Sequence, residues 1–346
     1  MSGTSLDGLD MAYCEFEKGR KWKYIIIYAE TKKYNKVWKD KLAAAYKKKY
    51  SEITGIDVEF GKFIGKEVLK FINDKKISPD FISSHGHTVF HRPEKGITVQ
   101  IGKGQTISSI CKLPVVCDFR SGDVALGGQG APLVPLVDKL LFSEYTYCLN
   151  LGGFANLSYD NSRGKRTAYD ICPVNMVLNA LANELGKEFD KAGKIAAKGK
   201  IDHELLSRLN SIPFYKSKPP KSLGREWVEK NFFPILDNHS ASVQDKARTV
   251  CEHIAVQIAF VVNTKIFSGH PRILVTGGGA YNQFLIKRIS FLSKPKMVLP
   301  DDQTIQFKEA MAFAFLGILR MNNEINILKS VTGAKRNSSG GKIYRS

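Results

Sequence analysis

The chain has 346 residues, a formal net charge of +19 and 43% hydrophobic residues. This length predicts two domains with a ligand-binding cleft between them, and the composition excludes a disordered or fibrous protein. The longest nearly uncharged apolar stretch, residues 310–319, is far shorter than the roughly 20 residues of a membrane span, and the chain does not begin like a signal peptide.

The positive charge and the cysteines narrow the function classes further. Lysines crowd residues 18–50, but no helix-turn-helix, zinc-finger or aromatic RNA-binding signature accompanies them. We therefore interpret the charge as a solvated basic face that attracts anionic metabolites, with nucleic-acid binding as the alternative. None of the six cysteines follows a C-x-x-C spacing, which predicts reduced thiols in a cytoplasmic protein rather than zinc ligands or disulfides.

The first part of the chain predicts a hairpin, two helices and a mixed sheet. Two β-rich runs flank a polar turn, and two segments with helical spacing follow. Short apolar runs broken by glycines and prolines come next and predict strands. These segments are residues 11–16 and 23–31 for the hairpin, 37–50 and 58–73 for the helices, and 81–82, 97–101 and 115–117 for the strands.

The second part repeats the order of strands, glycine turn and helix. Its predicted strands are residues 145–151, 155–159, 166–171 and 272–275, and its predicted helices are residues 241–267 and 309–321.

This repetition predicts two α/β lobes. The first comprises residues 1–143 and is completed by a closing helix at 309–328, and the second comprises residues 144–308. The polar, glycine-rich tail at residues 333–346 is expected to be disordered.

Three glycine turns carry the first sign of function. The opening M-S-G-T-S-L-D-G (residues 1–8) combines small residues, hydroxyls and one carboxylate, so its amides can approach phosphates while Asp7 addresses a metal ion or its waters. It is not a Walker loop, and alone such a segment is often only a tight turn. The other turns, N-L-G-G-F-A-N at 150–156 and V-T-G-G-G-A-Y-N at 275–282, also follow predicted strands. Together they favour a nucleotide site.

These three motifs, in this order, resemble the two phosphate motifs and the adenosine motif of the superfamily of sugar kinases, hsp70 chaperones and actin. Within it, C-D-F-R-S-G-D-V-A-L-G-G-Q-G-A-P-L-V-P at residues 117–135 is similar to the anhydro-N-acetylmuramic acid kinases. The resemblance runs from residue 1 to about residue 328. It implies an α/β, two-lobed actin-like ATPase (ribonuclease H-like) fold with a cleft between the lobes.

The opening loop departs from that pattern. Related kinases carry a short apolar strand before it, whereas here the motif starts at Met1. We therefore expect the first N-terminal strand to be missing, through a start codon assigned late or a truncation. An apolar N-terminal extension is then expected to raise stability and ATP affinity.

The resemblance implies a cytoplasmic kinase that uses ATP and Mg²⁺ on a small-molecule anhydro amino sugar, without nucleic acid or membrane, and it leaves a homodimer open as the assembly. The enzyme would open the 1,6-anhydro bridge of anhydro-N-acetylmuramic acid with water and phosphorylate O6, giving N-acetylmuramic acid 6-phosphate and ADP in peptidoglycan recycling and amino sugar catabolism. The residues implied for ATP and phosphate are Gly3, Thr4, Ser5, Leu6, Asp7, Gly8, Leu9, Asp10, Gly152, Gly153, Asn156, Gly277, Gly278 and Gly279. Asp7 would also hold Mg²⁺, directly or through water.

Asp170 is the implied catalytic base. It lies in Y-D-I-C-P-V-N (residues 169–175), at the end of an apolar strand, where a carboxylate would face the cleft. The family's usual D-T-G-P-G-N is changed here at Ile171, Cys172 and Val174, so the resemblance leaves the geometry of the loop open while it retains the Asp, Pro and Asn. Without the resemblance, a helix cap is the alternative role of such an Asp.

The implied sugar-binding residues are Arg120, Glu309, His87 and Thr88. The planar fork of Arg120 suits paired oxygens, but it could instead join Asp118 and Asp123 in a salt-bridge cluster. Glu309 matches a family carboxylate, or it simply favours a helix N-terminus. The histidine-rich S-H-G-H-T-V-F-H-R-P at residues 84–93 is interpreted as polar cleft lining without a bound metal.

Three other functions stay open at this point. They are another sugar kinase of the superfamily, a noncatalytic ATP-binding pseudokinase or chaperone-like hinge, and a nucleic-acid-binding protein.

Overall fold

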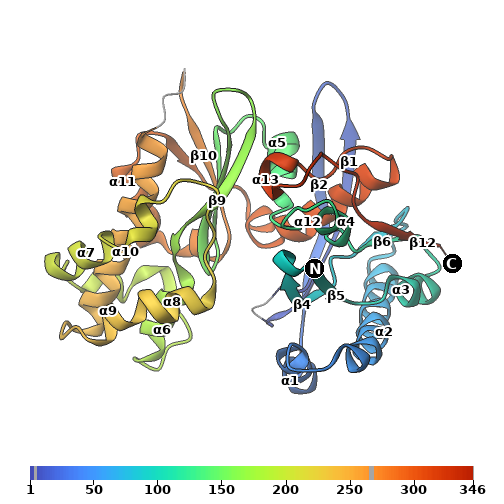
Figure 1. The fold of residues 1–346 in the computed structure, drawn as a ribbon, viewed down its shortest axis with the longest axis horizontal. Helices are drawn as coiled ribbons and strands as arrows, with labels where there is room; N and C mark the ends of the chain where they lie inside the picture. Colours follow the sequence, from blue (N-terminus) through green and yellow to red (C-terminus); the bar gives the residue numbers. More distant parts are fainter. Residues whose placement is uncertain (4–5, 265–268, 346) are drawn as a thin grey trace. The chain divides into compact units, whose positions relative to one another are not determined.

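The structure is a computed structural model that describes residues 1–3, 6–264 and 269–345. The chain divides into two compact units (Figure 1): unit 1 is Met1–Leu141 with Phe307–Ser346, and unit 2 is Phe142–Gln306. The boundaries predicted after residues 143 and 308 lie close to these divisions.

Unit 1 begins with a long antiparallel hairpin and two helices, as predicted. Strands β1 (Gly8–Lys18) and β2 (Trp22–Lys33) pair from end to end, with an irregularity between Tyr13 and Cys14. Helix α1 (Lys36–Ala45) is capped by Asn35, whose side chain accepts a hydrogen bond from Trp38 N (2.9 Å). Helix α2 (Tyr50–Lys75) ends where Lys76 turns left-handed.

The core of unit 1 forms where α2 meets the strands. The buried side chains of Phe60, Ile64 and Phe71 recur at helical spacing on one face of α2. They belong to one apolar cluster with residues of helix α3 (Gly104–Cys111) and strand β6 (Val115–Cys117).

The strands of unit 1 pair differently from the prediction. Strand β3 (Ile82–Ser83) lies parallel to β6, but β5 (Ile97–Ile101) forms a separate antiparallel ribbon with β4 (His87–Arg92). The placement of residues 97–101 in one sheet with residues 81–82 and 115–117 was therefore wrong. The partner strand β4 was missed because its histidines and arginine break the apolar pattern.

Residues 333–345 are ordered, so the disorder expected for residues 333–346 is contradicted over this described range. Strand β12 (Lys342–Tyr344) pairs antiparallel with β6. Asn326 Nδ2 donates to Gly340 O (2.8 Å), and Gly340 N donates back to Asn326 Oδ1 (2.7 Å). A Cβ on Gly340 would lie 2.9 Å from Phe119 O, so this glycine permits close packing rather than flexibility. Hydrogen bonds hold this segment, which is why its polar composition was misleading.

The remaining helices of unit 1 surround the strands. They are α4 (Ser121–Ala125), α5 (Val134–Leu141), α13 (Lys329–Thr332) and the single turn η1 (Pro93–Lys95). Helix α12 (Asp302–Met321) starts in unit 2 and continues through unit 1, so it begins earlier than the predicted 309. In the described part of unit 1 the strands form separate sheets, with the orders β1-β2, β12-β6-β3 and β4-β5.

Unit 2 is built on a five-stranded sheet in the order β11-β10-β7-β8-β9. Strands β7 (Tyr147–Leu151), β8 (Phe154–Asp160) and β9 (Arg166–Pro173) are antiparallel neighbours. Strand β10 (Arg272–Thr276) lies parallel to β7, and β11 (Lys296–Val298) lies parallel to β10. The strands predicted in this part of the chain are confirmed.

Helix α10 (Val243–Asn263) is the central helix of unit 2. Ser242 caps it, and Val250, Ile254 and Ile258 are fully buried in the core beside the sheet. It confirms the helix predicted at residues 241–267, of which residues 265–267 lie outside the described residues. The other helices are α6 (Asn175–Asn183), α7 (His203–Asn210), α8 (Arg225–Asn231), α9 (Phe233–Asp237) and α11 (Gln283–Leu292). Short turns η2 (Lys191–Gly193), η3 (Ala196–Lys198), η4 (Pro213–Lys216) and η5 (Gly278–Tyr281) complete the unit.

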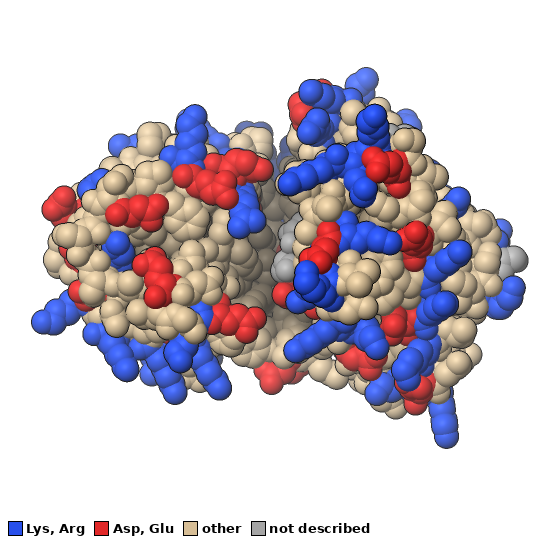
Figure 2. Space-filling view, turned by 90° about the horizontal axis from the view of Figure 1, so that it is seen from below, with Lys and Arg blue, Asp and Glu red and all other residues tan. Residues whose placement is uncertain are grey.

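The charged residues are spread over the surface of each unit. On the face shown in Figure 2, acidic side chains lie among the Lys and Arg side chains. On α1 and α2, Lys36–Asp40 (2.7 Å) and Lys70–Asp74 (2.6 Å) form ion pairs one helical turn apart. This arrangement is typical of solvated helix faces. Across the described residues, no helix combines the length and hydropathy of a membrane span, and all six cysteines are free thiols.

Candidate functional site

The second and third glycine turns lie side by side in unit 2. Thr276 at the end of β10 pairs with Asn150 near the end of β7, so the turns that follow these parallel strands meet at one sheet edge. Gly277 adopts a φ of 83°, and a Cβ there would lie 2.5 Å from Asn150 Oδ1 and 2.8 Å from Leu151 O. Only glycine allows this approach. Gly278 and Gly279 continue into η5.

The Gly152–Gly153 turn is fixed by the start of α6. Val174 N donates to Gly153 O (2.8 Å), and Asn175 N donates to Gly152 O (3.2 Å). The Asn175 side chain also donates to Leu151 O (3.2 Å). The loop whose sequence departs from the family's usual D-T-G-P-G-N therefore still supports the turn, through the backbone of Val174 and Asn175 and through the side chain of Asn175, which is unchanged from the family sequence.

Asp170 lies on β9, opposite Asn156 of β8. Its amide donates to Lys221 O (3.1 Å), and its Oδ2 accepts a hydrogen bond from Leu223 N (2.8 Å). Burial raises the pKa of the Asp170 carboxyl, and the Leu223 N–H opposes that rise. The helix-cap alternative does not hold, because α6 begins after Val174 and has no side-chain cap. A half-buried carboxylate with a raised pKa suits a general base.

The opening loop of unit 1 is anchored at both of its ends. Asp10 N donates to Met1 O (2.9 Å), and the Met1 ammonium donates to Asp10 O (2.7 Å). Within the loop, Leu6 has a φ of 58° and the Asp7 side chain is exposed. Gly3 is half-buried, whereas Gly8 and Leu9 are buried. Gly8 and Leu9 thus support the loop, and the predicted residues Thr4 and Ser5 lie outside the described residues.

His87 supports this loop through a contact with Ser2 inside unit 1. It is 4% exposed, and its Nδ1 lies 3.0 Å from Ser2 Oγ, which also accepts a hydrogen bond from Tyr34 OH (2.7 Å). The structure thus places His87 inside unit 1, whereas Thr88 on β4 is half-buried. This position favours support of the loop over direct ligand contact by His87.

Arg120 is hydrogen-bonded to a residue that the sequence analysis did not single out. Its Nε donates to His85 Nε2 (3.1 Å), and its Nη1 donates to Gly130 O (3.1 Å). Asp118 instead pairs with Lys342 (2.8 Å), and Asp123 accepts from Gly130 N (2.7 Å). The salt-bridge cluster considered for Arg120 is therefore not formed. Burial lowers the pKa of Arg120 to about 10, and Glu309 opposes that change.

Glu309 and Asp10 place two carboxylates near Arg120 and the Met1 ammonium. The pKa of Glu309 is raised by burial of the carboxyl among protein atoms and by the charge of Asp10. Arg120 and the Met1 ammonium act in the opposite direction and lower this pKa. The side chain of Glu309 is nevertheless accessible to solvent. Burial lowers the pKa of the Met1 amino group to about 6, and Asp10 and Glu309 oppose this. These four charged groups form the charged cluster of unit 1.

The histidine-rich string does not form a metal centre. His85 and His87 are buried with separate partners, and His91 is exposed beside Thr98. Within residues 1–3, 6–264 and 269–345, no three His, Cys, Asp or Glu side chains gather as metal ligands.

Two contacts were missed from the sequence. His85 joins Arg120 across 35 positions of the chain, and Leu223 joins Asp170 across 53. The alternation S-H-G-H could have indicated buried histidines on a strand, but no local signal pointed to Leu223.

These features define a two-unit α/β protein. Unit 2 contains two adjacent glycine turns and Asp170, a carboxylate suited to act as a general base, and unit 1 contains the charged cluster. Its sequence matches a family model described as Anhydro-N-acetylmuramic acid kinase over residues 1–346. The chain belongs to this family, which confirms the resemblance and the α/β kinase class predicted above.

Curated relatives span nearly the same length. The anhydro-N-acetylmuramic acid kinase of Vibrio parahaemolyticus serotype O3:K6 is 33% identical, with 99% of this chain and 96% of that protein covered. The kinase of the same name from Francisella tularensis subsp. novicida is 34% identical, with 99% and 97% covered.

Two solved structures have a weak likeness to the chain. The activator of 2-hydroxyisocaproyl-CoA dehydratase from Clostridium difficile has a TM-score of 0.35 at 15% identity, over 53% of this chain and 63% of that one. The ethanolamine utilization protein EutJ from Carboxydothermus hydrogenoformans has a TM-score of 0.36 at 14% identity, over 75% and 74%. Neither likeness bears on the function.

Proposed function

We propose that this protein is a cytoplasmic anhydro-N-acetylmuramic acid kinase of peptidoglycan recycling. It converts 1,6-anhydro-N-acetylmuramic acid, ATP and water to N-acetylmuramic acid 6-phosphate and ADP. The family match over residues 1–346 supports the activity. The observation that carries it for this chain is Asp170, a half-buried carboxylate of raised pKa on the strand next to the Gly152–Gly153 hairpin.

The reaction needs one base and one phosphoryl transfer. The water oxygen bonds to the anomeric carbon as the bond from that carbon to O6 breaks, and Asp170 takes the proton from the water. O6 then bonds to the γ-phosphorus while the bridging bond to ADP breaks, which releases ADP. We assign Oδ1 of Asp170 as the base, because Oδ2 already accepts a hydrogen bond from Leu223 N.

We assign the nucleotide to the glycine turns. In unit 2 these are Gly152, Gly153 and Gly277–Gly279, with Asn156 beside them, and the opening loop adds its own amides. Close backbone approach and positive φ are the features that bring amides to phosphate oxygens.

Asp7 is the residue we assign to Mg²⁺. Its carboxylate is exposed, and its backbone oxygen accepts a hydrogen bond from Tyr34 N (3.4 Å). A single exposed carboxylate fits Mg²⁺, which keeps waters and takes substrate phosphate oxygens as further ligands. When bound, Mg²⁺ neutralises negative charge on the polyphosphate.

The sugar is assigned to the charged cluster of unit 1. Arg120 presents a planar fork that is already oriented by His85 and Gly130, and Glu309 can accept hydrogen bonds from sugar hydroxyls. Thr88 is assigned as a further contact, and His87 acts through Ser2.

Sugar-dependent ADP release tests this function. Anhydro-N-acetylmuramic acid is expected to give a kcat/KM at least about 100-fold above those of glucose, glycerol and N-acetylmuramic acid, because buried polar groups reject substrates that leave them unpaired. Preference for glucose or glycerol would assign the chain to another sugar kinase activity. ATP binding without sugar-dependent turnover would support a pseudokinase instead.

Asp170→Asn tests the base. It removes the proton acceptor but keeps the shape of the side chain, so kcat is expected to fall about 10²-fold to 10⁴-fold with ATP affinity unchanged. Asp237→Asn, on an exposed position of the same unit, is the matched control. Full turnover by Asp170→Asn would remove Asp170 from this role.

A further inference from the structure

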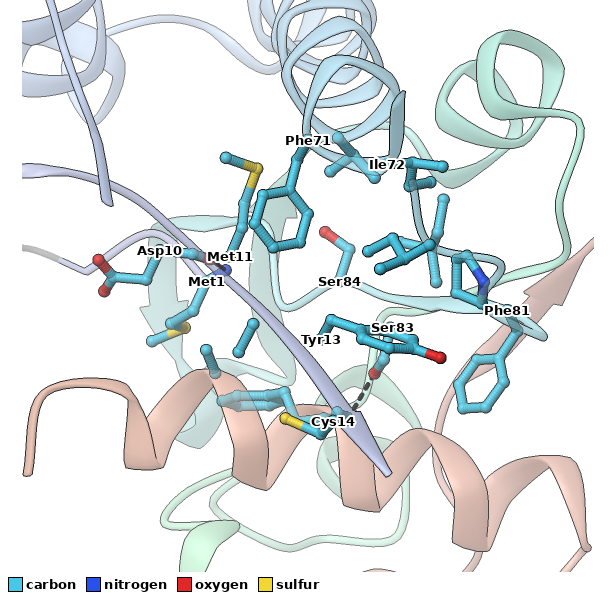
Figure 3. A pocket seen from close by; sticks show the side chains of 18 of the residues that line it. Met1, Asp10, Met11, Tyr13, Cys14, Phe71, Ile72, Phe81, Ser83 and Ser84 are labelled. Carbon is cyan, nitrogen blue, oxygen red and sulfur yellow. Dashed lines mark hydrogen bonds between the residues drawn. The ribbon is translucent and has the colours of Figure 1, made fainter. Parts of the chain in front are cut away.

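Two neighbours hold the guanidinium of Arg120, and the first of them is attached to helix α12. His85 Nε2 accepts a hydrogen bond from Arg120 Nε (3.1 Å), and the His85 ring packs on the Phe313 ring with centroids 4.5 Å apart. Ser83, which lines a cavity of about 480 Å³ in unit 1 (Figure 3), donates a hydrogen bond to Phe313 O. Since α12 also carries Glu309, this contact fixes Arg120 to the helix that supplies the second sugar residue.

The second neighbour is Gly130, whose position is set by a buried carboxylate. Gly130 O accepts from Arg120 Nη1 (3.1 Å), and Gly130 N donates to Asp123 Oδ2 (2.7 Å). The Asp123 residue is fully buried. Gly130 has a φ of 66°, and a Cβ at Gly128 would lie 2.2 Å from Asp123 Oδ2. Glycines at these positions therefore let the loop close around the carboxylate.

The other oxygen of Asp123 is bound by a residue near the end of the chain. Thr332, the last residue of helix α13, is 1% exposed, and its Oγ1 donates to Asp123 Oδ1 (2.8 Å) across 209 positions of the sequence. Thr332 O also accepts from Gln129 N (2.8 Å), which ties α13 to the same loop. A continuous chain of hydrogen bonds thus runs from Thr332 through Asp123 and Gly130 to Arg120.

We propose that Thr332 and Asp123 are positioning residues of the sugar site, which act on the sugar through Gly130 and Arg120. The proposal rests on the assignment of Arg120 to the sugar under the proposed function. Thr332 and Asp123 do not touch the ligand, because both are buried. The segment that follows α12 is then a working part of the sugar site, although it lies at the far end of the sequence.

The physical reason is the cost of a buried carboxylate oxygen that has no donor. If the Thr332 hydroxyl is removed, Asp123 Oδ1 loses its donor, and the loop shifts until another donor reaches this oxygen. Gly130 moves with the loop, because its N–H is bonded to Oδ2 of the same carboxylate. Its carbonyl then no longer orients Arg120, whose planar fork binds paired oxygens in one direction only.

Thr332→Val and Thr332→Ser are the first test, because valine keeps the volume of the side chain and serine keeps the hydroxyl. We expect Thr332→Val to raise the KM for the anhydro sugar about 10-fold, with kcat and the KM for ATP changed by less than about twofold. Thr332→Ser should stay within about threefold of the parent chain. Thr249→Val removes an equally buried hydroxyl in unit 2 and should leave both KM values unchanged.

Asp123→Asn is a second variant that tests the same contact if Thr332→Val does not fold. Its single amide oxygen cannot accept from both Thr332 and Gly130, so the same rise in the sugar KM is expected. Hydrogen exchange gives a readout that does not depend on activity. Exchange at the Gly130 amide should be at least about tenfold faster in Thr332→Val than in the parent chain or in Thr332→Ser.

The double variant Arg120→Lys/Thr332→Val distinguishes positioning from a general loss of stability. Lysine has no fork to orient, so removal of the Thr332 hydroxyl should raise the sugar KM by less than about twofold in this background. A further rise of about 10-fold would mean that Thr332 acts on the site by another route, and would overturn the proposal.

The other outcomes separate this proposal from the proposed function. An impaired Arg120→Lys with an unchanged sugar KM in Thr332→Val or Asp123→Asn would overturn the positioning role and leave Arg120 in the sugar site. Unchanged exchange at Gly130, or equal losses in Thr332→Val and Thr332→Ser, would also overturn it. Unaltered sugar kinetics in Arg120→Lys would instead overturn the assignment of Arg120 itself, and the positioning role with it.

Discussion

Arg120 fixes the protonation state of His85. Its guanidinium donates to His85 Nε2 (Nε 3.1 Å), and because a guanidinium only donates, this ring nitrogen must carry a lone pair. The ring proton is then on Nδ1, which donates to Gly86 O (3.1 Å). Burial and the charge of Arg120 hold the pKa of His85 well below its usual range, in agreement with a neutral ring.

Arg120→Lys should therefore weaken sugar use specifically. Lysine keeps the charge but loses the fork that His85 and Gly130 orient, and charge-assisted hydrogen bonds contribute about 1.5–3 kcal/mol each. We expect kcat/KM for the sugar to fall about 10-fold to 100-fold, with the KM for ATP unchanged. Steady-state kinetics beside the exposed Arg92→Lys control measures this. Unaltered sugar kinetics would contradict the assignment of Arg120.

Leu223→Pro should shift the pH dependence of catalysis. It removes the N–H that stabilises ionised Asp170, so the raised pKa of this carboxyl should rise further. We expect the acidic limb of kcat/KM to move up by about one pH unit. Leu223→Ala keeps the N–H and should leave the profile in place. Identical profiles for both variants would show that the bond does not tune Asp170.

Gly277→Ala and Gly153→Ala form a matched pair. A Cβ at Gly277 would meet Asn150 Oδ1 at 2.5 Å with φ at 83°, whereas nothing lies within 4 Å of a Cβ at Gly153. Strained backbone of this kind costs about 1–3 kcal/mol. Denaturant unfolding should show that loss for Gly277→Ala and a change within about 0.5 kcal/mol for Gly153→Ala. Equal stability of the two variants would mean that the turns are loosely packed.

His253 should make unit 2 sensitive to acid. It is fully buried between Asn210 and Tyr215, and burial lowers its pKa to about 3 from the usual 6.5. Below pH 6.5 the unfolded chain binds a proton that the folded chain does not, so the free energy of unfolding falls as the pH decreases toward 3. The loss is about 1.4 kcal/mol per pH unit, or about 2 kcal/mol at pH 5.

Comparison with His253→Gln isolates this effect from other titrating groups. The variant should be less stable at pH 7.5, yet lose less stability between pH 7.5 and pH 5 than the parent chain. Denaturant titrations at both pH values measure the difference. Parallel losses in the two proteins would show that His253 does not contribute.

Periodicity predicted the elements that bury a regular apolar face, such as α10 and β1. The proximity of the turns that follow β7 and β10 could also be expected, because these parallel strands end at the same edge of the sheet. Strand β12 could not be predicted from the sequence. It pairs with β6, which is far away in the chain, through backbone hydrogen bonds that almost any side chain permits. The hydrogen bond from Leu223 N to Asp170 could not be predicted for the same reason, because a backbone N–H is present whatever the side chain.

The discontinuity of unit 1 has a consequence for synthesis of the protein. Residues 142–306 leave the ribosome before the segment from Phe307, which supplies β12 and most of α12 to unit 1. Because domains fold as units during translation, unit 2 can be complete while β6 still exposes an open edge. The nascent chain is therefore most vulnerable to mispairing in the half that is made first.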